Sequence, residues 1–232
     1  VSEGSVVVKV DGVAVNTVSG NTLAALPDGD HLVRVEATNA SGTGYAEVAI
    51  TVDATAPVVT ITSPNAGPSK NRTPTLAYTV SDGDVIVTVD GQIVTAGSGQ
   101  SLSSLADGRH AIRVTSTDAA GNTGSAQVSF VVDNMPPTIY IESPVEGLVT
   151  TTSVPVSYGI SDGTATATID GAMSISSGST LNGLNNGSHT LTVVATDVAG
   201  NIGTKSVTFM VDTAAGNDDS NIYCSGTGTY VV

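Results

Sequence analysis

The chain of 232 residues has no tryptophan, only two phenylalanines and a single cysteine. A core must therefore be built from Val, Ile, Leu and Ala, and no disulfide can form within the chain. Positive charge is also scarce, because seven Lys and Arg stand against 21 Asp and Glu and leave a net charge of −14. A surface this acidic repels nucleic acid and anionic lipid, so neither is an expected partner. No apolar run is long enough to span a bilayer, and no stretch of helical period exceeds a turn or two.

The residues that are abundant favour strands and turns. Val, Thr and Ser dominate, and 26 glycines are spread along the chain. β-branched residues are typical of strands, and glycine is typical of the turns between them. The composition therefore predicts an all-β fold.

One segment occurs three times. It reads LPDGDHLVRVEATNASGT at 26–43, LADGRHAIRVTSTDAAGN at 105–122 and LNNGSHTLTVVATDVAGN at 184–201. The histidines of these copies, His31, His110 and His189, are 79 residues apart each time. In the middle copy, His110, Ile112 and Val114 should form one face of a strand. A fixed period of this length indicates tandem units, each large enough to bury a core of its own.

The repeat divides the chain into three units and a tail. We expect an incomplete domain at 1–53, domains at 54–133 and 134–212, and a tail segment at 213–232. The second unit should contain strands at 58–62, 74–80, 85–90, 92–95, 101–105, 109–117 and 125–132, lettered A, B, C, C′, E, F and G. Seven short strands with this spacing predict a β-sandwich. The proline-containing linkers at 52–57 and 132–137 should be stiff spacers in an elongated rod.

The first unit begins where strand B of the other units ends, because Ser2-Glu3-Gly4 aligns with Ser81-Asp82-Gly83. It should therefore lack strand A and most of strand B, and expose open sheet edges. Two interpretations stay open. The sequence is an arbitrary piece of a longer repeat protein, or the tail of one subunit completes the first unit of the next and builds a head-to-tail filament. Tyr230-Val231-Val232 read into Val1 resembles residues 77–80, although the tail is shorter than the missing segment.

The motif Leu26-x-Asp28-Gly29-x-His31-x-Val33-x-Val35-x-Ala37 and its two copies resemble the E–F corner and F strand of fibronectin type III and bacterial Ig-like domains. In those families a Tyr often occupies the place of these histidines. The linkers VDATAP and VDNMPP and the loops DAAGN and DVAGN resemble those of bacterial Ig-like repeats in large surface adhesins and other secreted multidomain proteins. The resemblance implies tandem Ig-like (fibronectin III-like) seven-stranded β-sandwiches, with calcium at the domain junctions.

The residues also permit an independent argument for calcium. In a sandwich of this topology, the linker after one domain meets the B–C and F–G loops of the next. Carboxylate and amide oxygens would gather there, and calcium takes about 6–8 oxygen ligands. The alternative is that these are turn residues, which Asp-Gly and Asp-x-x-Gly-Asn favour in any case. The predicted metal residues are Asp53, Asp82, Asp118 and Asn122 at one junction, and Asp133, Asp162, Asp197 and Asn201 at the other.

No catalytic or cofactor-binding residue is predicted. Each histidine stands without a second His or Cys at metal-ligand spacing, so we interpret it as a corner residue whose ring packs or bonds to the backbone. No Ser-His-Asp set stands out from the general abundance of Ser and Asp. Nothing in the pattern builds the cleft that paired carboxylates need for glycoside cleavage.

The sequence therefore predicts a non-catalytic extracellular or cell-surface protein, a structural or adhesive rod of Ig-like repeats. We expect it to associate with itself head-to-tail or to adjoin neighbouring repeats of a longer chain. Two other classes stay open, a spacer or carbohydrate-binding accessory module of a secreted enzyme and an Ig-like decoration of a phage surface. A sugar site would need exposed aromatic rings, for which Tyr45, Tyr140 and Tyr223 are the candidates.

Overall fold

The computed structural model describes residues 4–214. These residues form twenty strands and no helix, so the all-β prediction is confirmed. Residues 4–214 include no helix that could cross a membrane. The strands pair within each repeat, and each repeat is therefore described by itself.

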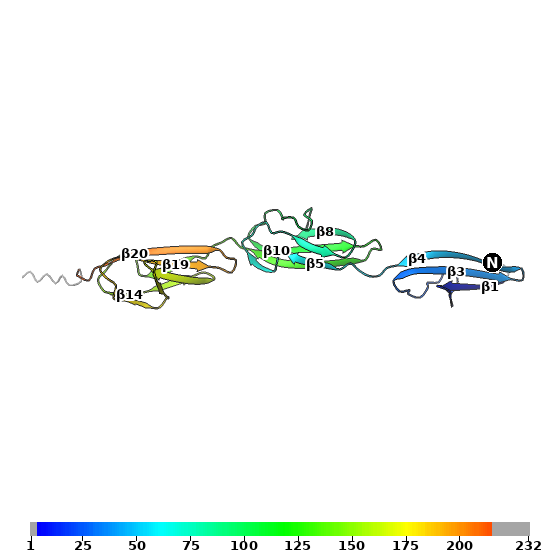
Figure 1. Cartoon of the computed structure of the whole chain (residues 1–232), viewed down its shortest axis with the longest axis horizontal. Helices are drawn as coiled ribbons and strands as arrows, with labels where there is room; N and C mark the ends of the chain where they lie inside the picture. The colour runs from blue at the N-terminus through cyan, green and yellow to red at the C-terminus, as the bar shows by residue number, and fades with distance from the viewer. Residues whose placement is uncertain (1–3, 215–232) are drawn as a thin grey trace, which may run out of the picture. The chain divides into compact units, whose positions relative to one another are not determined.

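Repeat one, residues 4–53, forms a single antiparallel sheet with the order β2-β1-β3-β4. Figure 1 shows β1, β3 and β4 side by side in blue and cyan. Asp11-Gly12 makes the hairpin after β1, and both residues have positive φ (49° and 80°), as a type I′ turn requires. Residues 16–28 contain no strand, so they add no second sheet. The strands are β1 (Ser5–Val10), β2 (Val13–Val15), β3 (Gly29–Asn39) and β4 (Gly42–Val52).

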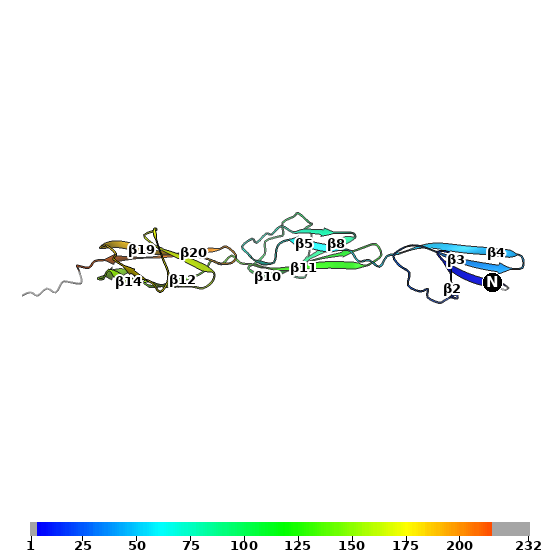
Figure 2. The same cartoon turned by 60° about the horizontal axis from the view of Figure 1, so that its bottom comes forward.

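Repeat two, residues 54–133, has two sheets. The larger sheet has the order β6-β11-β10-β8-β9, and the smaller sheet pairs β5 with β7. Figure 2 shows β10 and β11 running side by side in this repeat. The strands are β5 (Val59–Ser63), β6 (Gly67–Ser69), β7 (Ala77–Val80), β8 (Asp84–Val89), β9 (Gln92–Val94), β10 (Gly108–Thr117) and β11 (Thr123–Val132).

Two elements of repeat two differ from the sequence prediction. Strand E, expected at 101–105, is reduced to an isolated bridge between Thr75 and Ser101. Strand β6 lies in a segment that was expected to be a loop, and it pairs in parallel with the end of β11, with Val131 opposite Pro68. Its Gly-Pro-Ser composition carries no strand signal, but proline is tolerated on an edge strand, where its missing N–H is not needed.

Repeat three, residues 134–212, retraces repeat two. Its larger sheet has the order β13-β20-β19-β16-β17, and its other pairs are β12 with β15 and β14 with β18. The parallel edge pairing recurs, because β13 lies beside the end of β20 with Leu148 opposite Met210. The strands are β12 (Ile139–Ser143), β13 (Gly147–Val149), β14 (Ser153–Pro155), β15 (Ser157–Ile160), β16 (Thr164–Ile169), β17 (Met173–Ile175), β18 (Thr180–Asn182), β19 (Gly187–Thr196) and β20 (Ile202–Val211).

Apolar residues on alternate positions of the larger sheets make the cores of repeats two and three. On β10, His110, Ile112 and Val114 are all buried, which confirms the predicted face. On β19, Leu191 and Val193 occupy the same places and are buried as well. The core cluster of repeat three consists of Ile139, Val154, Val156, Ala167, Ile169, Leu181, Leu184, Leu191, Val193, Ala195, Phe209 and Val211.

Candidate functional site

The linker before repeat two is held by the loop between β10 and β11. The Asn122 side-chain amide donates one hydrogen bond to the Asp53 carbonyl oxygen (3.0 Å) and another to Asp118 Oδ2 (3.0 Å). Asp118 Oδ1 in turn accepts the Asn122 backbone N–H (2.8 Å). The amide of Asn122 therefore joins the loop to the linker backbone, with the Asp118 carboxylate fixing its orientation.

The linker before repeat three has the same arrangement. The Asn201 amide donates to the Asp133 carbonyl oxygen (2.8 Å) and to Asp197 Oδ2 (2.9 Å), and Asp197 Oδ1 accepts the Asn201 N–H (2.8 Å). Burial raises the pKa of the Asp197 carboxyl, but hydrogen bonds from Asn201 and from backbone N–H groups outweigh it and lower the pKa overall. The pKa of Asp118 is lowered for the same reasons. Both carboxylates are thus held in the charged form that the loop needs.

The remaining predicted metal residues satisfy turns in their own neighbourhood. Asp53 Oδ1 accepts the Thr55 N–H (3.1 Å), and Asp133 Oδ1 accepts the Met135 N–H (3.0 Å). The carboxylates of Asp82 and Asp162 accept the N–H of the glycine that follows each of them. Within residues 4–214 no group of three or more His, Cys, Asp and Glu side chains is arranged to hold a metal ion. Three of the four predicted residues at each junction are thus brought together by hydrogen bonds, and calcium stays a prediction.

The linkers are also bonded to the corner that precedes the F strand. Asp28 accepts hydrogen bonds from Ala54 N (2.9 Å) and from the Thr55 hydroxyl. After β20, Asn186 accepts the Thr213 N–H (3.1 Å) in the same manner. These hydrogen bonds lower the pKa of Asp28, the Thr55 contact contributing most. The only sequence signal was an Asp or Asn at the same position of each copy, which a turn explains equally well.

Each corner histidine bonds to a backbone carbonyl, as predicted. His31 Nε2 lies 2.8 Å from the Pro27 carbonyl oxygen, and His31 Nδ1 lies 2.7 Å from Asp11 Oδ2. Carbonyl and carboxylate oxygens only accept, so the doubly protonated ring is the form that donates in both contacts. Asp11 Oδ1 also accepts the Leu32 N–H (2.8 Å). The Asp-Gly hairpin is therefore tied to the F strand through its own aspartate.

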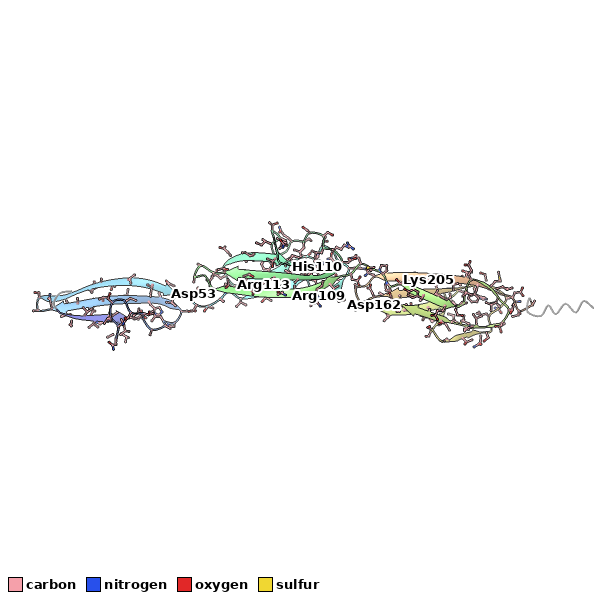
Figure 3. All side chains as sticks on the ribbon, turned by 180° about the vertical axis from the view of Figure 1, so that it is seen from behind. Asp53, Arg109, His110, Arg113, Asp162 and Lys205 are labelled. Carbon is pink, nitrogen blue, oxygen red and sulfur yellow. The ribbon has the colours of Figure 1, made fainter. Side chains whose placement is uncertain are left out.

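The same corner recurs in the other repeats. His189 lies 2.8 Å from Asp170 Oδ2 and 2.9 Å from the Asn185 carbonyl oxygen. His110, labelled on β10 in Figure 3, bonds to the Ala106 carbonyl oxygen (2.9 Å), and its ring centroid lies 5.8 Å from that of Phe130. The aspartate partner was missed from sequence. Its signal was an Asp-Gly turn that precedes the histidine by about the same number of residues in every copy.

Thermal stability should be highest between about pH 4 and pH 6.5. The Asp11 contact raises the pKa of His31 above its ordinary 6.5, and the Asn185 carbonyl and Asp170 raise that of His189. A raised histidine pKa gives stability that is present below 6.5 and is lost as the pH rises through the folded-state value. The lowered pKa values of Asp11 and Asp170, from 3.8, give stability that is lost as the pH falls through them. Calorimetry from pH 3 to pH 9 measures both limbs.

The control variants are His31→Gln and His189→Gln, which should flatten the alkaline limb. They should also shrink the acid limb, because the histidine contact is the largest cause of the lowered pKa values of Asp11 and Asp170. An alkaline limb that is unchanged in the double variant, or a melting temperature that rises toward pH 9, would contradict the assignment.

The sheet of repeat one has an apolar face that no other strand within residues 4–214 covers. Val6 is 51% exposed and Val35 is 41% exposed. Val114 and Val193 take the place of Val35 in the other repeats, as the strand registers show, and both are 0% exposed. A groove of about 640 Å³ lies over this face and is bordered by Val6, Val8, Val33, Val35, residues 17–21 and Leu23. A contiguous apolar surface of this kind marks an interaction site or an aggregation hazard.

The aromatic candidates for a sugar site are differently placed. Tyr45 is exposed on β4, but the Arg34 guanidinium lies 3.7 Å from its ring centroid and covers one face. Tyr140 is exposed on β12. Tyr223 lies outside the described residues.

A sequence model described as the bacterial Ig-like domain matches residues 60–134 and 136–213. Together the two matches cover more than half of the 232 residues. The chain belongs to the bacterial Ig-like domain family. Tandem Ig-like domains of this kind are typical of extracellular structural or adhesive modules, and the Ig-like fold is typically non-catalytic. The predicted domain boundaries and rod shape stay predictions.

The solved structures that resemble this bacterial Ig-like chain include fibronectin III-like modules, Ig domains and cadherin domains. The fibronectin(III)-like modules of Clostridium thermocellum CbhA share 16% identity at a TM-score of 0.40, over 75% of this chain and 100% of theirs. Sidekick-1 immunoglobulin domains 1–5 share 15% identity at a TM-score of 0.46, over 91% of this chain and 54% of theirs. Drosophila N-cadherin EC1–4 shares 15% identity at a TM-score of 0.35, over 80% and 58%. Likeness at this identity concerns the fold alone, and no curated protein sequence matches the chain.

Proposed function

We propose that this chain is a non-catalytic extracellular structural or adhesive protein, whose copies join head-to-tail by strand donation. The tail of one copy covers the open sheet of repeat one in the next copy and completes its sandwich. Head-to-tail contacts that do not close on themselves build filaments. Main-chain pairing would supply affinity, and the side chains that enter the groove would supply specificity.

The single observation that carries the proposal is the exposed face of repeat one. Val35 is 41% exposed where Val114 and Val193 are 0% exposed, although all three stand at the same place in the same kind of sheet. Burying apolar surface contributes about 25 cal/mol per Å². Covering a face of several valines therefore favours association strongly. The acidic net charge would keep isolated copies soluble until the strand is inserted.

Calcium at the junctions is part of the same proposal. The carboxylates of Asp118 and Asp197 have pKa values lowered from the ordinary 3.8, so both are ionised at neutral pH and well below it. Each carboxylate shares the amide of Asn122 or Asn201 with the linker carbonyl of Asp53 or Asp133, and that carbonyl is a further oxygen of the kind that calcium takes.

Deleting residues 217–232 should abolish concentration-dependent association. The deletion removes the proposed donor strand and leaves every described strand in place, so the melting temperature of repeats two and three should not change. Sedimentation velocity over a hundredfold concentration range, with electron microscopy of the same samples, measures the effect. A control replaces residues 217–232 with a Gly/Ser sequence of equal length, which should also fail to associate. Association that survives the deletion would rule out strand donation by the tail.

A further inference from the structure

Two glycines near the start of the last strand of repeats two and three make room for the incoming chain. A Cβ atom on Gly124 would lie 1.8 Å from the Pro57 carbonyl oxygen. A Cβ on Gly203 would lie 2.2 Å from the Pro137 carbonyl oxygen. Pro57 and Pro137 stand just before β5 and β12, the A strands of their repeats. Each glycine therefore marks the place where strand A passes over the sheet, and no larger residue fits there.

Gly44 stands at the same place in repeat one. It pairs with Ala37, as Gly203 pairs with Ala195. A Cβ on Gly44 would meet nothing within 4 Å, and the φ of Gly44 lies outside the left-handed region. Neither its neighbours nor its own backbone therefore require glycine, which otherwise weakens the interior of a strand. The room that Gly124 and Gly203 give to a carbonyl is present at Gly44 and is not used by residues 4–214.

The edge of the sheet is open at the same strand. Among the strands of the described chain, β4 is the last of its sheet, as Figure 2 also shows, whereas β11 and β20 are each flanked by a parallel strand. In repeat two the chain passes Gly124 at Pro57 and then pairs, as β6, with the far end of β11. In repeat three it passes Gly203 at Pro137 and then pairs, as β13, with the far end of β20. A strand that completes repeat one should therefore run parallel to β4, from Gly44 toward Val52.

The chain after β20 begins with the same hydrogen bonds as the linker that follows repeat one. Asp212 Oδ1 accepts the Ala214 N–H (3.0 Å), which repeats the bond of Asp53 with Thr55 N. Thr213 is bonded by Asn186 as Ala54 is bonded by Asp28. The chain that leaves repeat three therefore starts with the same bonds as the linker after repeat one. That linker leads into strand A of repeat two.

We infer that Gly44 receives the backbone carbonyl of Gly216 from a second copy, with the residues from Asn217 onward running parallel to β4 as strand A. Gly216 follows Asp212 by four residues, as Pro57 follows Asp53, so Gly216 takes the place of Pro57. Glycine keeps the backbone carbonyl that makes this contact. The segment then ends in Tyr230-Val231-Val232, the part that reads as strand B. This inference rests on the proposed strand donation and specifies where the strand enters and in which direction it runs.

The junction between copies differs from the internal ones in one respect. Gly42 stands two residues before Gly44, as Asn122 and Asn201 stand two residues before Gly124 and Gly203, so the amide bond to the linker carbonyl has no counterpart there. The contact at Gly44 and the buried apolar face are then what hold the donated strand.

Gly44→Val in the full chain tests the inference, with Ala49→Val on the other face of β4 as the matched control. The added side chain has open space in the free chain, so the melting temperature should stay unchanged. It should weaken association, measured by sedimentation velocity, about tenfold or more, since it fills the space of the incoming carbonyl. It should weaken binding of a fluorescent peptide of residues 213–232 to the same extent. Ala49→Val should change neither quantity more than about twofold.

Gly44→Ala adds only the obstructing Cβ and replaces the valine variant if valine disturbs β4. Equal peptide binding by Gly44→Val and the unchanged chain overturns the inference, as does binding of a peptide of residues 54–69 when the tail peptide does not bind. Chains that stay monomeric but bind the tail peptide in a Gly44-dependent way would contradict the filament and support the Gly44 site. Chains that associate equally well with and without Gly44→Val would contradict the Gly44 site and leave the filament supported.

Discussion

Ile112→Ala and Leu191→Ala should each lower the free energy of unfolding of their repeat by about 2–5 kcal/mol. Both side chains are 0% exposed and lie at the centre of the F strand in a closed sandwich. The loss combines the transfer of the removed methyl groups with the cavity left behind, because a packed core collapses only in part. Differential scanning calorimetry of the full chain should show one transition moving while the others stay in place.

Val35→Ala is the matched control for these variants. Its side chain lies on the same face of the corresponding strand but is 41% exposed, so the change should cost less than about 1 kcal/mol in a dilute sample. A cost for Val35→Ala equal to that of the two buried sites would mean that repeat one already has a closed core, and the account of its open face would fail.

Gly124→Val and Gly203→Val should each destabilise their repeat by about 3 kcal/mol. The new Cβ would lie 1.8 Å from one proline carbonyl oxygen and 2.2 Å from the other, and both oxygens belong to backbone that cannot rotate away. Strand A must therefore move off the sheet, which removes the β5–β7 pairing in one case and the β12–β15 pairing in the other. Calorimetry measures the cost, and hydrogen exchange at β7 or β15 should show faster exchange.

The same change at Gly44 is the control, since valine there meets open space in the free chain. Valine is otherwise a favourable strand residue, so a loss at Gly124 and none at Gly44 isolates the steric effect of the passing chain. No loss at Gly124 would show that strand A is not held where the structure places it.

Much of the fold could be predicted from the sequence because turns and strands depend on the residues next to them in the chain. The Asp-Gly pair at 90–91 has positive φ at both residues, and the alternation of Ile112 and Val114 follows the period of a strand. The weak elements could not be predicted in this way. β6 consists of Gly67, Pro68 and Ser69, and only its pairing with the end of β11 makes it a strand.

The candidate sites divide along the same line. The approach of Asn122 to Asp53 could be predicted, because the topology places a loop beside a linker, but the atom that is bonded is the backbone carbonyl and not the carboxylate. The pairing of His31 with Asp11 spans 20 residues and two strands, so it depends on register rather than on local spacing. The degree of exposure of the open face of repeat one follows from the structure alone, because Val35 is 41% exposed and Val114 at the same place in repeat two is 0% exposed.

Hydrogen exchange of β3 and β4 at low and high protein concentration tests the central claim most directly. If a second copy completes repeat one, amides of Ile50 to Val52 and of the neighbouring β3 should exchange more slowly at high concentration, and only in the chain that retains residues 217–232. Exchange in these strands that is the same at both concentrations, or slowed equally without residues 217–232, would contradict the account.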